Sequence, residues 1–191
     1  LEAGVKADFG KDIFPWLYKE LKVYAYNTPE YLKDMGTPDR LSKVEQAISS
    51  GKVAQRNLKN PQRCIFLDRD GVINIDTDLI HKAEDFELYP YAGESIRKIN
   101  KMGFLAVVVT NQSVLARGMC SVADLDEIHK KMETELGHQG AFVEAIYYCP
   151  HHPHGGFPEE VPELKIDCHC RKPKPGMLLD AAQRFNIDLS K

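Results

Sequence analysis

A short apolar run with polar residues on both sides is the feature that most constrains the fold of this chain. Residues 64–67, Cys-Ile-Phe-Leu, are too few for a helix and do not alternate with polar side chains. A run of this kind fits a strand that is buried on both faces, as in a parallel sheet. Two further strands are predicted at 104–109 and 142–148, where β-branched and aromatic residues gather.

Helical patterns alternate with these strands. They are predicted at 92–102 and 122–136, and a final helix at 176–185 follows the third strand and a long loop. Strands that alternate with helices indicate an α/β fold with a doubly wound, Rossmann-like parallel sheet. Ligands of such sheets bind beyond the carboxyl ends of the strands. The loops that follow the strands are therefore the expected place for a functional site.

The character of the chain changes twice along its length. Residues 1–51 contain helical stretches broken by turn signals, and we expect a small, mainly helical segment. Residues 52–62 are polar without an apolar period, which predicts a linker, and residues 63–191 hold the α/β pattern. A chain of 191 residues suits one core with a small companion segment.

Charge and hydropathy exclude several classes of partner. The net charge is −3 with both signs scattered, so we expect no basic face for nucleic acid and no polybasic membrane anchor. No apolar run reaches the length of a membrane span, and the start lacks the pattern of a signal peptide. We expect a cytoplasmic protein with a small anionic ligand; the sequence does not indicate an oligomeric state.

Polar residues stand at the ends of the predicted strands. Asp68 and Asp70 follow the first strand, Thr110 and Asn111 follow the second, and Lys172 precedes the last helix. Two carboxylates separated by one residue suit phosphoryl transfer, because one can attack phosphorus while the other protonates the leaving oxygen. Mg²⁺ would offset the repulsion between carboxylate and phosphate. The alternative is that an aspartate after a strand merely forms a turn or caps a helix.

Three of the five cysteines lie among histidines near the end of the chain. The segments are Cys-Pro-His-His-Pro-His at 149–154 and Cys-His-Cys at 168–170. In a reducing compartment this density of ligands favours metal over disulfides, and thiolates with one imidazole make a tetrahedral zinc site. The alternative is a set of free thiols and surface histidines. Cys64 is expected in the core, and Cys120 has no assigned role.

The order of the motifs DRDGVIN, TNQS and CRKPKPG resembles the first three motifs of the haloacid dehalogenase superfamily, from Arg63 to the end of the chain. The resemblance implies that Asp68 is the nucleophile and Asp70 the general acid and base. Thr110 and Lys172 would hold the phosphoryl group, and Asn111 would orient Asp68 or the phosphate. Mg²⁺ would be bound by the Asp68 carboxylate and the main-chain carbonyl of Asp70.

The cysteine segments resemble the zinc loop of D,D-heptose 1,7-bisphosphate phosphatases and bacterial histidinol-phosphate phosphatases. This resemblance implies a structural zinc that pins a loop in place of a cap domain. TNQSVLARG is closer to the heptose branch, although Val114 replaces a usual glycine, and Arg117 and Arg171 would bind substrate. The implied zinc ligands are Cys149, His151, Cys168 and Cys170.

The resemblance implies a Mg²⁺-dependent phosphoric monoester hydrolase. Its expected substrate is the 7-phosphate of D-glycero-D-manno-heptose 1,7-bisphosphate, cleaved through an aspartyl-phosphate on the route to nucleotide-activated heptose, a lipopolysaccharide precursor. Histidinol phosphate is the alternative substrate. The family's fourth, acidic motif is expected beyond Leu189 and is absent, so the third Mg²⁺ ligand is not identified and a zinc-stabilised module without catalysis is a further alternative.

The beginning of the chain carries a second resemblance. GKDIFP at 10–15 and YLKDMGTP at 31–38 are similar to the end of a sugar-1-phosphate nucleotidyltransferase core, in which Asp34 matches a metal-binding aspartate. The chain would then be a fragment of a bifunctional nucleotide-sugar enzyme. The alternative is an accessory helical layer packed on the phosphatase domain.

Overall fold

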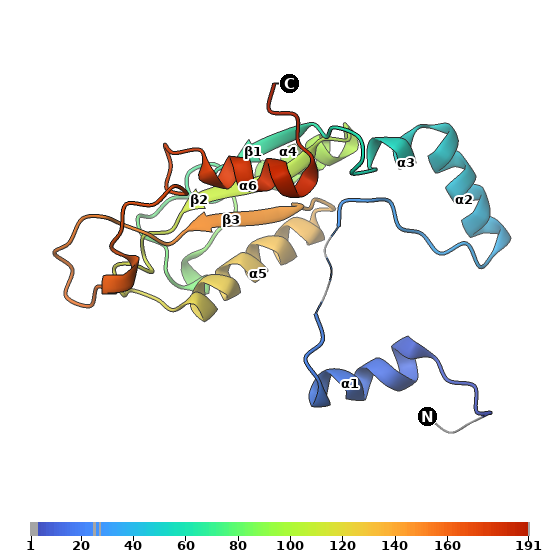
Figure 1. The fold of residues 1–191 in the computed structure, drawn as a ribbon, viewed down its shortest axis with the longest axis horizontal. Helices are drawn as coiled ribbons and strands as arrows, with labels where there is room; N and C mark the ends of the chain where they lie inside the picture. The colour runs from blue at the N-terminus through green and yellow to red at the C-terminus, as the bar shows by residue number, and fades with distance from the viewer. Residues whose placement is uncertain (1–3, 25, 27, 191) are drawn as a thin grey trace.

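Three parallel strands form the centre of the computed structural model, which describes residues 4–24, 26 and 28–190. The strands are β1 (Cys64–Leu67), β2 (Leu105–Asn111) and β3 (Ala145–Cys149), in the order β1-β2-β3 (Figure 1). All three predicted strands are confirmed, although β3 begins three residues later than predicted. The α/β class with a parallel sheet is therefore correct.

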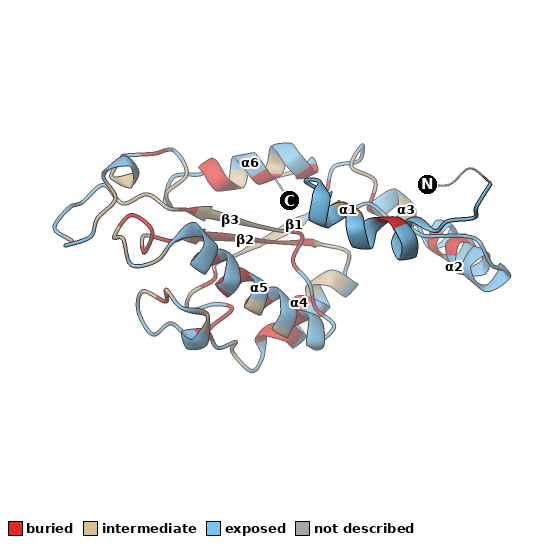
Figure 2. Ribbon diagram, turned by 90° about the horizontal axis from the view of Figure 1, so that it is seen from below, coloured by how far each residue is buried: buried red, intermediate tan, exposed pale blue. Residues whose placement is uncertain are grey.

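Helices cover both faces of the sheet, and the side chains of β2 point alternately into the two cores that these helices form with it. α4 (Ala92–Lys101) and α5 (Val122–His138) lie on one face, and α6 (Gly176–Phe185) lies on the other (Figure 2). Ala106 and Val108 join the first core, whereas Leu105, Val107 and Val109 join the second. This alternation explains why β2 is buried on both sides.

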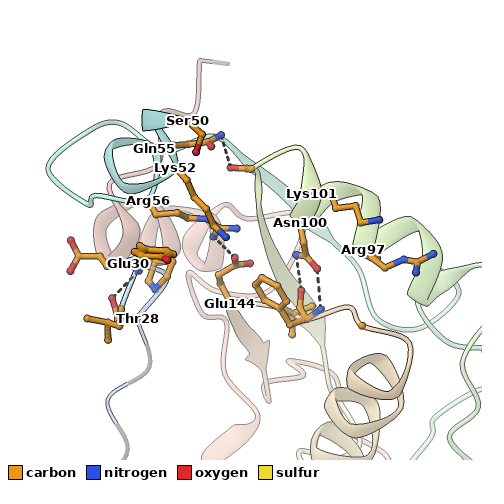
Figure 3. A pocket seen from close by; sticks show the side chains of 17 residues that line it. Thr28, Glu30, Ser50, Lys52, Gln55, Arg56, Arg97, Asn100, Lys101 and Glu144 are labelled. Carbon is orange, nitrogen blue, oxygen red and sulfur yellow. Dashed lines mark hydrogen bonds and ion pairs between the residues drawn. The ribbon is translucent and has the colours of Figure 1, made fainter. Parts of the chain in front are cut away.

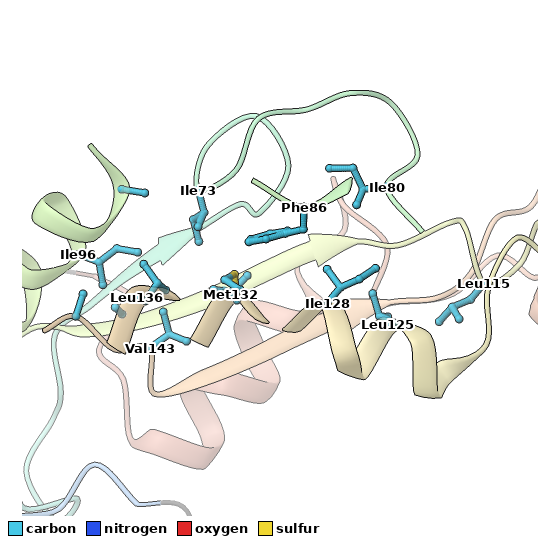
Figure 4. Close-up of a cluster of buried hydrophobic side chains, with 14 residues drawn as sticks. Ile73, Ile80, Phe86, Ile96, Leu115, Leu125, Ile128, Met132, Leu136 and Val143 are labelled. Atoms are coloured by element: carbon cyan, nitrogen blue, oxygen red, sulfur yellow. The ribbon is translucent and has the colours of Figure 1, made fainter. Parts of the chain in front are cut away.

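The core under α4 and α5 is the larger of the two. Ile96 of α4 lies at the end of this core near Leu136 of α5, and Leu125, Ile128 and Met132 of α5 extend the core along the sheet (Figure 4). Ser121 and Asp124 form a capping box at the start of α5. Each buried aliphatic side chain contributes about 1.5–3 kcal/mol. Phe86 and Ile73 of the loop after β1 are also buried here, so this core fixes that loop as well as the helices.

β1 lies at the edge of the three-stranded sheet, and its side chains are only half-buried, less than the sequence predicts. The chain after α6 returns to this edge. Ile187 forms a parallel bridge with Gln62, whose N–H donates to Asn186 O at 2.7 Å and whose carbonyl accepts from Asp188 N at 2.9 Å. Arg63 O faces β2, so the groups of its neighbour Gln62 point to the outer side of β1. This bridge places the chain after α6 beside the outer edge of β1.

The N-terminal segment consists of η1 (Phe9–Ile13), α1 (Phe14–Glu20), α2 (Pro38–Ser49) and α3 (Lys52–Gln55); η2 (Ala83–Asp85) and η3 (Pro162–Leu164) lie in later loops. The sequence predicts a helix at 41–48 that begins near Thr37 or Asp39, and Thr37 is indeed the N-cap of α2. α1 stands apart from the sheet (Figure 1), with Trp16 and Tyr18 exposed. No described helix has the length and apolarity needed to cross a membrane.

A buried ion pair fixes the predicted linker to the α/β domain, and α3 shows that this stretch is partly helical. Arg56 Nη1 donates to Glu144 Oε1 at 2.7 Å, and both residues are less than a tenth exposed (Figure 3). Glu144 Oε2 also accepts from Ala106 N at 2.6 Å. The pair lies in a cavity of about 760 Å³ at the amino ends of β2 and β3, the end of the sheet away from the predicted site.

Removal of one partner of this buried pair should destabilise the fold. We expect Arg56→Met to lower the free energy of unfolding by about 3–5 kcal/mol, because Glu144 loses its cation. Burial raises the pKa of Glu144 and Arg56 opposes that rise, so the variant's carboxyl has a higher pKa still. A raised pKa in the folded state favours the protonated form, so the deficit should grow as pH rises.

Denaturant unfolding at several pH values measures the effect. The exposed pair Glu94 and Lys98 provides the matched control, and Lys98→Met should leave stability nearly unchanged. Equal stability of Arg56→Met and the parent would show that the buried pair does not hold this segment.

Candidate active site

Asp68 and Lys172 meet at the carboxyl end of the sheet, as the order of the motifs predicts. Lys172 Nζ lies 2.5 Å from Asp68 Oδ2 and donates to Val109 O at 3.0 Å. Asp68 Oδ1 accepts from Arg69 N at 2.8 Å. The Asp68 side chain is 41% exposed, so the carboxylate is held by these contacts yet remains open to a ligand.

Asn111 makes a contact that the resemblance does not specify. Its amide pairs with the backbone of Lys172 in both directions: Lys172 N donates to Asn111 Oδ1 at 3.0 Å, and Asn111 Nδ2 donates to Lys172 O at 3.2 Å. The end of β2 thereby fixes the segment that carries Lys172. Asn111 thus orients the lysine that lies against Asp68; it also lines the cavity, and its role toward the phosphate stays a prediction.

Asp70 is surrounded by hydrogen-bond donors. Arg69 donates to both of its oxygens at 3.0 and 3.1 Å, Asn74 Nδ2 donates to Oδ1 at 3.1 Å, and Gln112 Nε2 donates to Oδ2 at 2.8 Å. The pattern in the sequence identifies Asp70 but none of these three partners. The position of Gln112 inside the TNQS motif could have indicated a role at the site, whereas no feature of the sequence indicates that Arg69 is buried.

Thr110, Asp68, Asp70 and Lys172 line one cavity of about 250 Å³. Thr110 is buried, and its hydroxyl accepts from Gln112 Nε2 at 2.9 Å. Asn111 lines it as well, so the cavity brings together five of the predicted residues from three separate segments of the chain.

The loop after β1 adds two carboxylates to this cavity that sequence reasoning missed. Asp76 and Asp78 line it, and Asp78 and Leu79 have φ angles of 68° and 50°. Consecutive non-glycine residues with positive φ are costly and concentrate at functional sites. Among the lining residues, four carboxylates face the single cation Lys172. A phosphate would be repelled here unless a cation were bound, so the donor set fits Mg²⁺.

A second cluster lies beside this cavity. Cys149 at the end of β3, His151, Cys168 and Cys170 place their ligand atoms within 4.8 Å of one another. The three sulfur pairs are separated by 3.2–3.5 Å, and His151 Nδ1 lies 3.4 Å from Cys170 Sγ and 3.6 Å from Cys149 Sγ. A tetrahedral zinc with bonds of about 2.3 Å needs edges close to these values. Burial raises the pKa of the Cys149 thiol, so zinc would have to displace its proton.

The histidines that are not implied as ligands lie outside the cluster. His152 Nδ1 is 3.1 Å from His154 O, and His169 is exposed. Arg171 Nη1 donates to His151 O at 2.9 Å and so supports the loop.

The two arginines expected to bind substrate do not line the cavity. Arg171 contacts His151, and the guanidinium of Arg117 lies 4.2 Å from the ring centre of Phe157. The Nε of Arg117 is buried without a partner in the described part of the chain. Their roles toward substrate stay predictions.

Two curated proteins similar to this chain share one description. The D-glycero-beta-D-manno-heptose-1,7-bisphosphate 7-phosphatase of Escherichia coli K12 is 44% identical over 126 residues, which are 66% of this chain and 64% of that protein. The phosphatase of the same name from Pasteurella multocida is 42% identical over 127 residues, 66% of each chain. The chain therefore spans less than two thirds of the length of these relatives. No family model matches it.

Solved structures agree with this similarity. A D,D-heptose 1,7-bisphosphate phosphatase from B. bronchiseptica, complexed with magnesium and phosphate, has a TM-score of 0.58 at 39% identity, over 67% of this chain and 66% of that one. A HAD-like phosphatase from Mesorhizobium loti has a TM-score of 0.62 at 36% identity, over 68% of this chain and 61% of that one. The α/β domain has the fold of haloacid dehalogenase-type phosphatases.

The geometry of the cysteine cluster predicts its response to metal removal. Elemental analysis of the purified protein should find about one zinc per chain, because three thiolates and one imidazole fill a tetrahedral shell. Chelation should lower the melting temperature, and Cys168→Ser should lower zinc content and stability together.

Cys120→Ser is the matched control, since Cys120 is half-buried and belongs to no ligand cluster in the described residues. It should leave the zinc content unchanged. Purified protein that binds no zinc, or zinc that survives the loss of Cys168, would overturn the assignment.

Proposed function

We propose that this chain, which over about two thirds of its length is related to the haloacid dehalogenase-type D,D-heptose 1,7-bisphosphate phosphatases, carries the catalytic half of a sugar-phosphate phosphatase. The observation that carries the proposal is the contact of Asp68 with Lys172 in a cavity that also holds Asp70 and Thr110. Nucleophile, acid and phosphate-binding groups then stand within reach of one phosphoryl group.

The first half of the reaction transfers the phosphoryl group to Asp68. Oδ2 of Asp68 forms a bond to phosphorus as the bond from phosphorus to the sugar oxygen breaks. The electron pair leaves with the sugar oxygen, which takes a proton from Asp70. Asp70 is held three residues from the end of β1, with its carboxylate on the same cavity as Asp68.

The second half releases inorganic phosphate. Asp70, now deprotonated, takes a proton from a water molecule whose oxygen bonds to phosphorus. The bond from phosphorus to Asp68 breaks, and its electron pair returns to the carboxylate, so both aspartates regain their starting states.

Lys172 and Thr110 hold the oxygens of the transferring group. The Lys172 ammonium lies against Asp68, where those oxygens must approach, and the hydroxyl of buried Thr110 can donate to them. When bound by the Asp68 carboxylate and the Asp70 carbonyl, Mg²⁺ would supply positive charge that offsets the excess of carboxylates. Zinc at the cysteine cluster would be structural, since the four protein ligands leave it no open position.

The heptose bisphosphate is the proposed substrate because both curated relatives carry that description. The proposed reaction removes the 7-phosphate, and a cytoplasmic location belongs to the same proposal. We further propose that the N-terminal segment is a separate unit from the phosphatase domain; its resemblance to a nucleotidyltransferase stays a prediction.

Asp68→Asn tests the nucleophile in the intact protein. The amide keeps the shape of the carboxylate but cannot attack phosphorus, so turnover with Mg²⁺ should fall by about three orders of magnitude or more with the fold intact. Phosphate release and thermal unfolding measure the two effects. Asp34→Asn, a change of the same kind at a distant exposed carboxylate, is the control. Activity within a few-fold of the parent would assign the nucleophile elsewhere.

Substrate preference separates the two phosphatase alternatives. We expect kcat/KM for D-glycero-D-manno-heptose 1,7-bisphosphate to exceed that for histidinol phosphate, measured on the same preparation with Mg²⁺. Faster hydrolysis of histidinol phosphate would replace the proposed substrate, and absence of any Mg²⁺-dependent turnover would favour a zinc-stabilised module without catalysis.

A further inference from the structure

A fully buried arginine lies beneath the proposed active site. Arg69 is 0% exposed, although it stands between the two catalytic aspartates in sequence. A buried guanidinium is tolerated only when its charge and its donors are satisfied. The partners of Arg69 therefore show what the protein uses this residue for.

Every side-chain nitrogen of Arg69 has a partner. Nε and Nη2 donate to the two oxygens of Asp70, a bidentate contact that fixes the plane of the carboxylate. Nη2 also donates to Gln112 Oε1 at 2.9 Å. Nη1 lies 3.3 Å from Nε2 of His129, which belongs to α5.

His129 approaches Arg69 from the buried side of α5. Its ring is 7% exposed and packs near Tyr148 of β3, with ring centres 5.7 Å apart. Burial and then the neighbouring Arg69 lower the pKa of His129 to about 4, while Asp70 opposes this. The ring is therefore neutral near pH 7, and its unprotonated Nε2 accepts from Arg69.

Gln112 connects the same network to the phosphate-binding side. Its carbonyl accepts from Arg69, and its amide nitrogen donates to both Asp70 and Thr110 at 2.8 and 2.9 Å. The orientation of the amide is set because only this arrangement satisfies all three neighbours. Arg69 thus acts on Asp70 directly and on Thr110 through one intermediate.

We propose that Arg69, held from behind by His129, is a positioning residue that aims the Asp70 carboxylate at the leaving oxygen. The inference rests on the proposed function, because it assigns a use to Asp70 as acid and base. Neither Arg69 nor His129 lines the cavity, so neither touches the substrate. Loss of the acceptor at His129 leaves one arm of the guanidinium unsatisfied and lets the Arg69 and Asp70 pair rotate.

This role predicts a dependence on the leaving group. An alkyl phosphate needs Asp70 to protonate its poor leaving oxygen, whereas 4-nitrophenyl phosphate releases a stable phenolate without that help. Disorder at Asp70 should therefore slow hydrolysis of the alkyl phosphate, whereas transfer of the phosphoryl group from the aryl ester to Asp68 should continue. A general loss of structure would slow both.

The test compares two substitutions of His129 in the full chain with Mg²⁺. His129→Leu removes the acceptor, and His129→Gln supplies a carbonyl in its place. His138→Leu, an exposed position on the same helix, is the control. Steady-state turnover of the alkyl phosphate that the parent hydrolyses fastest is measured beside single-turnover release of nitrophenolate with enzyme in excess.

We expect His129→Leu to lower kcat for the alkyl ester by about 10- to 100-fold with little change in KM, because a displaced general acid costs a rate factor of that order. Nitrophenolate release should stay within about threefold of the parent, and His129→Gln should restore most of kcat. Parent-like kcat in His129→Leu, equal losses on both esters, or no recovery in His129→Gln would each overturn the inference. A parent without turnover on any ester would overturn the proposed function itself, and this inference with it.

Discussion

The hydrogen bonds at the end of β2 hold the rest of the site together. Three consecutive residues there have three different roles. Thr110 lines the cavity, Asn111 pairs with the backbone of Lys172, and Gln112 forms hydrogen bonds with both Asp70 and Arg69. β2 is buried on both faces and paired on both sides, so it is the most rigid support that the sheet offers. A site assembled on this strand needs little reorganisation when a ligand binds.

The metal cluster belongs to the same unit. Gln112 N donates to Cys149 O at 2.8 Å, which ties the end of β2 to a proposed zinc ligand. At the other end of the cluster, Cys170 lies two residues before Lys172. Zinc binding would therefore fix both the backbone just before the lysine and the end of β2 that pairs with it. Metal loss should disturb phosphate binding through the position of Lys172 and not through chemistry.

The pattern of apolar residues predicts most of the fold, because a helix or strand that is buried on one face or on both requires apolar residues at the corresponding positions. The helix at 176–185 and the strand at 64–67 match the structure at both ends. The cysteine cluster is also foreseen, since ligand chemistry restricts residue types. The partners of Asp70 are not, because contacts such as that of Arg69 with His129 join residues far apart in the chain, and neither composition nor spacing records them. For the same reason the sequence does not reveal that Arg171 donates to the His151 carbonyl.

The central claim is that Asp68 accepts the phosphoryl group beside Lys172. Beryllofluoride, which mimics an acyl-phosphate on a carboxylate, tests it most directly in the intact protein with Mg²⁺. A crystal structure of the trapped protein should show the fluoride group bonded to an Asp68 oxygen, with Lys172 and Thr110 in contact with the fluorines. An Asp68 carboxylate that stays unmodified at saturating beryllofluoride, or a group bonded to another aspartate, would contradict the account.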